Sequence, residues 1–168
     1  LGDVYKRQII YIIFFHNLRA ERFRYARKRA NITIIIMENE STTEFRPLIL
    51  VAEDDDSNFK LIKAIIGKKC DILWAKNGEE IVNLFRENRD RAAAILMDIK
   101  MPVMTGLDAT VIIRKENQNI PIIMQTAYAF STDKENAMKC GATEVLVKPI
   151  TLSILRNCLT NYFPQLKW

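Results

Sequence analysis

Residues 48–54 read LILVAED, an unbroken apolar run that ends abruptly at two adjacent acids. Two further runs end in the same way: residues 93–98, AAILMD, end at an aspartate, and residues 145–148, VLVK, end at a lysine. Apolar runs without polar alternation predict strands that are buried on both faces, as in a parallel sheet covered by helices. Parallel strands end at one shared edge of the sheet, which is where ligands bind in such folds.

Helical patterns alternate with these runs five times. Between them lie helix signals such as Asn77 with Glu80 and Thr132 with Glu135, which are both spaced as capping pairs, and Gly141 as a helix stop. Alternating strands and helices predict an α/β domain with a parallel, doubly wound sheet and right-handed crossovers. The predicted strands are 48–52, 70–75, 93–98, 121–125 and 144–147, and the predicted helices are 57–66, a helix after 77, 106–115, 132–140 and 151–162. The first helix has one apolar stripe, formed by Leu61, Ile62, Ile65 and Ile66, and either Asp55 or Asp56 is its candidate cap.

The charged residues at the strand ends predict the chemistry of the site. Glu53 and Asp54 follow the first strand, Asp98 ends the third, and Lys148 follows the fifth. Carboxylate oxygens are the ligands that hard divalent cations prefer, and a lysine beside them can pair with phosphoryl oxygens. Three acids and one cation at one edge therefore predict a divalent-metal and phosphoryl-transfer site.

Composition separates a basic leader from a nearly neutral globular part. The chain has 168 residues and a formal net charge of +5, of which residues 1–46 carry +4 (nine Lys/Arg against five Asp/Glu). The three cysteines have no metal-ligand spacing, which favours reduced structural thiols in a cytoplasmic domain. Because most of the excess positive charge lies in the leader, the net charge of the chain says little about the partners of the globular part.

The leader itself allows two interpretations. Residues 1–8 contain DVYKRQ, which resembles a translated sequencing adapter, and we expect an artefact. Residues 9–15 are apolar and the arginine-rich residues 19–29 follow, so residues 9–46 are either the cytoplasmic exit of a truncated transmembrane helix or a soluble basic helix with a polar linker. Membrane contact is expected only in the first case, through residues 9–29, and nucleic-acid binding is not expected because no reader motif accompanies the arginines.

Four segments in order resemble the receiver domain of two-component response regulators, most of all the receivers of hybrid histidine kinases. They are LVAEDD (50–55), MDIKMPVMTG (97–106), QTAYA (125–129) and VKPI (147–150). The resemblance implies a flavodoxin-like (βα)5 fold with strand order 2-1-3-4-5, formed by residues 47–168. It also implies phosphorelay signalling, with a histidine kinase or a histidine phosphotransfer domain as the partner.

The resemblance implies a role for each residue of the acidic group. Asp98 is expected to be the phosphoacceptor, and Glu53, Asp54, Asp98 and the backbone carbonyl of Lys100 are expected to hold Mg²⁺. Crowded carboxylates repel one another, and a divalent cation relieves that repulsion while it neutralises incoming phosphoryl oxygens.

Two further side chains are implied to contact the phosphoryl group. Thr126 is expected to donate its hydroxyl to one phosphoryl oxygen, and Lys148 is expected to pair with another. The Lys148–Pro149 bond is expected to be cis, Ala127 to keep the entrance small, and Gly106 to allow tight chain passage. Asp98, Thr126 and Lys148 thus form the implied catalytic set, which serves the domain's own phosphorylation and dephosphorylation and not the turnover of a separate substrate.

One position departs from the common family pattern. Val145 stands three residues before Lys148, where many members carry an aromatic ring that moves inward on phosphorylation; Tyr128 is a candidate substitute. The alternative function is therefore a phosphorylation-independent, receiver-like binding module. A metal-dependent phosphatase is disfavoured because Lys100 stands where such enzymes need a general acid.

Overall fold

The computed structural model describes residues 45–127 and 132–168. The expectations for residues 1–8, for nearly all of residues 9–46 and for Tyr128 fall outside these ranges. Within them the strands are β1 (Leu48–Ala52), β2 (Asp71–Ala75), β3 (Ala92–Asp98), β4 (Ile122–Thr126) and β5 (Glu144–Val147), and the helices are α2 (Asp56–Ile66), α3 (Gly78–Glu87), α4 (Gly106–Glu116), α5 (Thr132–Lys139) and α6 (Leu152–Tyr162).

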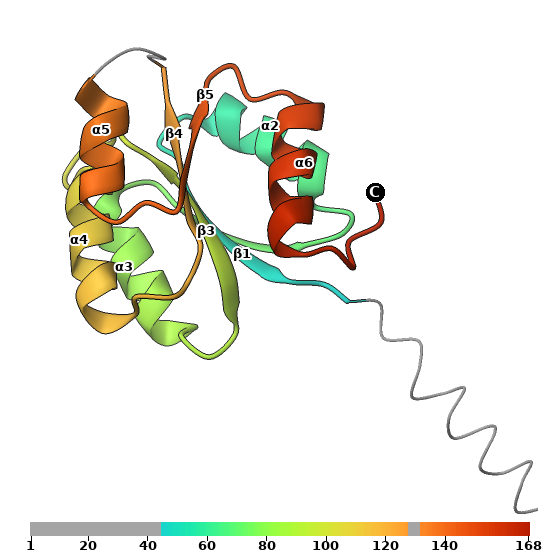
Figure 1. Cartoon of the computed structure of the whole chain (residues 1–168), viewed down its shortest axis with the longest axis horizontal. Helices are drawn as coiled ribbons and strands as arrows, with labels where there is room; N and C mark the ends of the chain where they lie inside the picture. The colour runs from blue at the N-terminus through green and yellow to red at the C-terminus, as the bar shows by residue number, and fades with distance from the viewer. Residues whose placement is uncertain (1–44, 128–131) are drawn as a thin grey trace, which may run out of the picture. The chain divides into compact units, whose positions relative to one another are not determined.

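The five strands form one parallel sheet in the order β2-β1-β3-β4-β5, which confirms the predicted topology. Helices α2 and α6 cover one face, and α3, α4 and α5 cover the other (Figure 1). An apolar core lies between the sheet and the helices on each of its two faces. Successive residues along a strand point alternately into one core and the other. In β1, for example, Leu50 joins the core beneath α3 and α4, whereas Ile49 and Val51 join the core beneath α2 and α6.

The helices begin directly beyond the sheet's carboxyl edge because a side chain caps four of them there. In each case the side chain accepts a hydrogen bond from the backbone N–H three residues later, which satisfies a donor that the first turn leaves unpaired. The predicted cap at Asn77 is confirmed, and of the two candidates for the first helix the cap is Asp55, not Asp56. The other two capping residues are Thr105 and Thr151. Gly141 ends α5 with a φ of +100°, as its helix-stop role predicts.

Two local expectations were wrong. Strand β4 begins at Ile122 and not at Pro121, because proline has no N–H for the ladder, although its carbonyl accepts from Ile95 N. Leu61 was expected to face inward with the apolar stripe of the first helix, but it is 47 % exposed. Its side chain lines a pocket that is partly open to solvent, together with Lys148 and Pro149.

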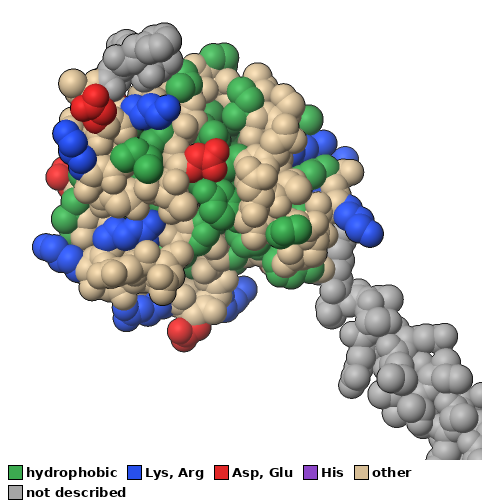
Figure 2. Space-filling view, in the orientation of Figure 1, with side chains coloured by type: hydrophobic (Ala, Val, Ile, Leu, Met, Phe, Trp, Pro, Cys, Tyr) green, Lys and Arg blue, Asp and Glu red, His purple; other side chains and the backbone are tan. Residues whose placement is uncertain are grey.

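Charged side chains are scattered over the face of the molecule that Figure 2 shows. In Figure 2, lysine and arginine are scattered over the face shown and form no single patch, in keeping with the nearly balanced charge of residues 47–168. Of the described helices, none is long and apolar enough to cross a bilayer.

Candidate functional site

The carboxyl edge of the sheet brings the three predicted acids together. Glu53 directly follows β1, Asp54 comes next in the turn, and Asp98 is the last residue of the adjacent strand β3. Each offers a carboxylate oxygen, and these atoms all lie within 4.8 Å of one another. Glu53 and Asp98 are buried, whereas Asp54 is exposed, so the group opens to solvent on one side only.

Lys148 bridges the two buried acids. Its ammonium lies 2.6 Å from Asp98 Oδ2 and 2.9 Å from Glu53 Oε2, although 50 and 95 residues of chain separate it from them. Burial favours the neutral form of Lys148, but its hydrogen bonds to the two carboxylates outweigh that effect and hold its pKa above the ordinary value. One positive charge thus faces three acids, and the site keeps a net negative charge that attracts a cation.

Glu53 is held from a second side by α2. Asn58 Nδ2 donates to Glu53 Oε1 over 3.0 Å, while Oε2 accepts from Lys148. Burial raises the pKa of the Glu53 carboxyl, and the two hydrogen bonds only partly offset this. The role of Asn58 was not predicted from the sequence. One signal could have indicated this role. Asn58 lies four residues after Asp54, in the first turn of a helix that starts at this edge of the sheet.

The peptide unit that joins Glu53 to Asp54 is held by β2. The indole N–H of Trp74 donates to the carbonyl oxygen of Glu53 over 2.8 Å, and Glu53 N donates to Ala75 O over 3.1 Å. Nothing in the sequence indicated the contact of Trp74, because a tryptophan in an apolar run is expected in the core.

The start of α4 packs directly on the backbone of Asp98. A Cβ added to Gly106 would lie 2.0 Å from the Asp98 carbonyl oxygen, so only glycine fits, as the sequence predicted. Gly106 N donates to Ile99 O, and Lys100 N lies 3.4 Å from Asp98 Oδ1. The chain after Asp98 therefore turns back beside the carboxylate, which places the backbone of Lys100 next to the acid group. The use of its carbonyl as a metal ligand stays a prediction.

Thr126 and Lys148 are joined at the neighbouring strand ends. Lys148 N donates to Thr126 O over 2.7 Å, and Thr126 lies one residue beyond Gln125, the partner of Asp98 in the β3–β4 ladder. The Lys148–Pro149 peptide bond is cis, as expected. Val145 lies in β5 and is only partly buried against the core under α3 and α4.

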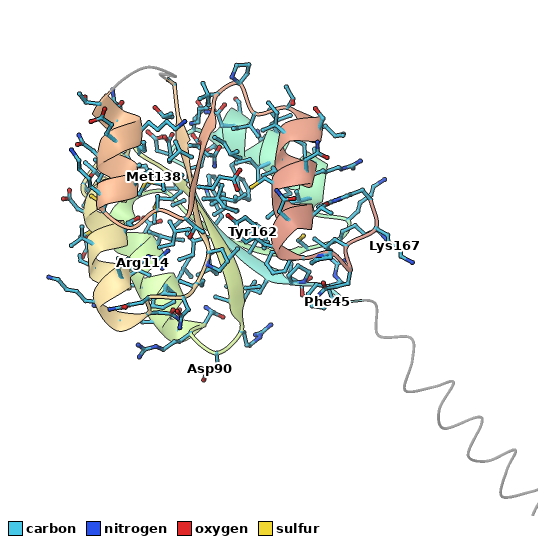
Figure 3. The ribbon with its side chains drawn as sticks, in the orientation of Figure 1. Phe45, Asp90, Arg114, Met138, Tyr162 and Lys167 are labelled. Carbon is cyan, nitrogen blue, oxygen red and sulfur yellow. The ribbon has the colours of Figure 1, made fainter. Side chains whose placement is uncertain are left out.

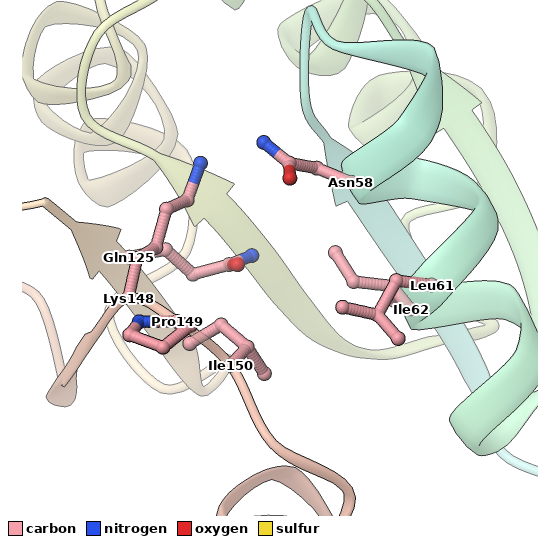
Figure 4. Close-up of a pocket in the computed structure, with 7 residues that line it drawn as sticks. All are labelled: Asn58, Leu61, Ile62, Gln125, Lys148, Pro149 and Ile150. Atoms are coloured by element: carbon pink, nitrogen blue, oxygen red, sulfur yellow. The ribbon is translucent and has the colours of Figure 1, made fainter.

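A small pocket adjoins the site on the α2 side (Figure 4). It holds about 320 Å³ of space, part of it open to solvent. Apolar side chains form most of the wall, and Lys148 connects it to the acid group. The lining residues are Asn58, Leu61, Ile62, Gln125, Lys148, Pro149 and Ile150.

Fold and site together define a class: a doubly wound α/β domain with an acidic, cation-attracting site at the carboxyl edge of its sheet. A profile of the response regulator receiver domain matches residues 49–160. The chain therefore belongs to the response regulator receiver family.

Individual relatives agree with this assignment. Hybrid signal transduction histidine kinase I of Dictyostelium discoideum is 40 % identical over 115 residues, which cover 64 % of this chain but only 7 % of the kinase. The receiver domain of a sensor histidine kinase from Pseudomonas aeruginosa, solved with magnesium in its active-site cleft, is 32 % identical with a TM-score of 0.65, covering 71 % of this chain and 99 % of that one. A Saccharomyces cerevisiae receiver, solved with its histidine phosphotransfer protein, is 30 % identical with a TM-score of 0.65 over 70 % and 88 % of the two chains.

Proposed function

We propose that this receiver accepts a phosphoryl group from a phosphohistidine onto Asp98 and thereby takes part in a phosphorelay. The observation that carries the proposal is the pairing of Asp98 with Lys148 inside a group of three acids. A carboxylate held beside an ammonium at an open sheet edge is placed both to attack phosphorus and to have the product's charge balanced.

In the proposed step a carboxylate oxygen of Asp98 forms a bond to phosphorus while the P–N bond of phosphohistidine breaks. The bonding electron pair leaves with the imidazole nitrogen, and an acyl phosphate remains. Lys148, 2.6 Å from Asp98 Oδ2, is near enough to pair with the arriving phosphoryl oxygens. Thr126 is proposed to donate its hydroxyl to another of these oxygens.

The residues present fit a magnesium ion. Glu53, Asp54 and Asp98 offer three carboxylate oxygens within 4.8 Å of one another, and hard oxygen ligands are what Mg²⁺ requires. The Lys100 carbonyl is the proposed fourth protein ligand. When bound, the ion supplies positive charge that offsets the carboxylates and the phosphoryl oxygens. The exposed position of Asp54 leaves the ligand group open toward solvent, from which the ion and the phosphodonor approach.

The partner proposed for this site is a histidine kinase or a histidine phosphotransfer domain. Two relatives support this: the similar yeast receiver was solved with a histidine phosphotransfer protein, and the Dictyostelium relative reported above is a hybrid histidine kinase. The match covers only 7 % of that kinase. That this receiver belongs to a longer hybrid kinase, and that it lies in the cytoplasm, are therefore proposals as well.

The test is phosphorylation of the full chain by acetyl phosphate with Mg²⁺, followed by intact mass. We expect one added phosphoryl group that requires Mg²⁺ and is absent from Asp98→Asn, which is nearly isosteric and should keep the native circular dichroism spectrum. Asp90→Asn, in the turn between α3 and β3 at the other end of the sheet (Figure 3), is the matched control and should still be modified.

An unmodified wild-type protein would contradict phosphoacceptance from this donor. A kinase-supplied phosphohistidine would then be tried in the same assay. Failure with both donors, in a folded protein, would favour the phosphorylation-independent binding module instead.

A further inference from the structure

The peptide unit between the first two acids of the site is held by a side chain that no motif includes. Trp74 donates its indole N–H to the carbonyl oxygen of Glu53 at 2.8 Å, and that carbonyl belongs to the peptide bond joining Glu53 to Asp54. The preceding bond, from Glu53 N to Ala75 O, is the last backbone contact between the ends of β1 and β2. The indole therefore restrains the first peptide unit beyond the sheet. That unit carries one acid at each end.

We propose that Trp74 is a positioning residue of the acidic site, which sets the affinity for Mg²⁺ by orienting the Glu53–Asp54 peptide unit. This inference rests on the proposed function, because it assumes that the acid group binds Mg²⁺. The ψ of Glu53 and the φ of Asp54 set both the orientation of this planar peptide unit and the directions of the two Cα–Cβ bonds relative to each other, so one hydrogen bond to the unit restrains two ligands. Outer contacts that orient metal ligands are worth a measurable part of the binding free energy.

The indole is itself held in place from several directions. Phe59 of α2 stacks on it with ring centroids 4.0 Å apart and planes only 3° from parallel. Lys76 lies over the ring at 4.7 Å from its centroid, and the same ammonium pairs with Asp56 at 2.9 Å. The ring is therefore restrained by the first turns of α2 and by the end of β2, which is what a rigid hydrogen-bond donor needs.

A packing role alone would not need the nitrogen. A phenylalanine at residue 74 would keep an aromatic ring against Phe59 but would lack the N–H that reaches Glu53. Trp74→Phe thus separates the two roles. The matched control is Trp168→Phe, which removes the only other indole of the chain, one that donates to the hydroxyl of Thr160 near the C-terminus.

The first measurement is the Mg²⁺ dissociation constant of the full chain by calorimetry, together with the melting temperature without Mg²⁺. We expect Trp74→Phe to weaken Mg²⁺ binding about five-fold, the equivalent of one ordinary hydrogen bond. Trp168→Phe should leave the constant unchanged. A lower melting temperature with an unchanged constant in Trp74→Phe would show a purely structural role and overturn the proposal.

The second measurement uses the wild-type chain and so does not depend on a variant folding. Two tryptophans produce two indole N–H signals in a ¹H–¹⁵N spectrum, and each variant assigns one of them. On titration with Mg²⁺ the Trp74 signal should move, with a midpoint equal to the calorimetric constant, and the Trp168 signal should stay. A stationary Trp74 signal during saturation would overturn the proposal. If the wild type binds no Mg²⁺, the proposed function fails first and this inference fails with it.

Discussion

Among single residues, Lys148 contributes most to the electrostatics of the site. Its side chain is 21 % exposed, and its ammonium contacts one oxygen of each buried acid. Charge-assisted hydrogen bonds of this kind are stronger than neutral ones, and removing one partner leaves the other buried without compensation. The same residue therefore stabilises the metal-free domain and, in the proposed function, is available for the phosphoryl group.

We predict that Lys148→Ala destabilises the metal-free protein by about 2 kcal/mol, because Glu53 and Asp98 are left facing each other without a counter-charge. Mg²⁺ affinity should be kept or increase, since Lys148 competes with the ion for the same oxygens. Urea unfolding with and without Mg²⁺ measures both effects. Lys139→Ala, which breaks an exposed pair with Glu135, is the control and should change stability by less than about 0.5 kcal/mol. Loss of Mg²⁺ affinity in Lys148→Ala would contradict the roles assigned here.

At the scale of elements, the contact between β3 and α4 sets how closely the helix approaches Asp98. Gly106 is the first residue of α4, and it lies so close to the Asp98 carbonyl that no Cβ would fit between them. The loop before it is held by Gly78 N, which donates to Met104 O, and it contains Val103 with a φ of +66°, a conformation that β-branched residues rarely adopt. This backbone hydrogen bond thus ties the loop that follows Asp98 to the start of α3.

We predict that Gly106→Ala destabilises the domain by about 3 kcal/mol, because the new Cβ would lie 2.0 Å from a backbone oxygen that cannot move without shifting β3 or α4. Val111→Ala, at a 40 % exposed position of the same helix, is the control and should cost less than about 1 kcal/mol. Chemical unfolding of both variants tests this. Equal stability of Gly106→Ala and wild type would contradict the close approach.

The contact between β5 and α6 predicts a pH dependence at the alkaline end. Burial, helped by the nearby Glu144 carboxylate, raises the pKa of the Cys158 thiol to about 12 from an unfolded value of 9.0. Since the folded state keeps this proton more tightly than the unfolded state, stability falls as the pH rises from 9 toward 12.

Comparison of wild type with Cys158→Ala isolates this effect from those of Cys70 and Tyr162, whose pKa values are also raised. The alanine variant should be less stable than wild type at pH 7.5, because a buried side chain is shortened. At pH 10 the difference should shrink by about 1 kcal/mol. A difference that grows with pH would contradict the assigned direction of the pKa shift.

At the scale of the whole molecule, the proposed Mg²⁺ binding would be linked to folding through the acid group. The three acids come from two strands and a turn, so they are close together only in the folded state. A ligand that binds only the folded state stabilises it in proportion to the logarithm of its concentration.

We predict that Mg²⁺ at a hundred times its dissociation constant raises the free energy of unfolding by about 2.7 kcal/mol, and that a chelator reverses the gain. Asp54→Asn should remove most of this gain while changing the metal-free stability little, because Asp54 is exposed. Asp90→Asn is again the control. Stabilisation that persists in Asp54→Asn would place the ion elsewhere.

The sequence by itself determined the strands, the order of the charged residues along the edge and most helix starts. It could do so because these depend on local patterns: buried runs without alternation, capping side chains, and glycine where the chain must pass closely. Even there, the inward place expected for Leu61 was wrong, since periodicity assigns a face to a residue but does not show whether another element covers that face.

Only the tertiary structure decided which atoms of the site touch. Lys148 reaches Glu53 across 95 residues of chain, Asn58 takes the other oxygen of Glu53, and Trp74 holds its carbonyl from a neighbouring strand. These contacts depend on the order of the strands in the sheet, on the register of β1 against β2 and on the packing of α2, and none of these leaves a periodic signal in the sequence. The kind of site follows from local chemistry, whereas its geometry arises from long-range packing.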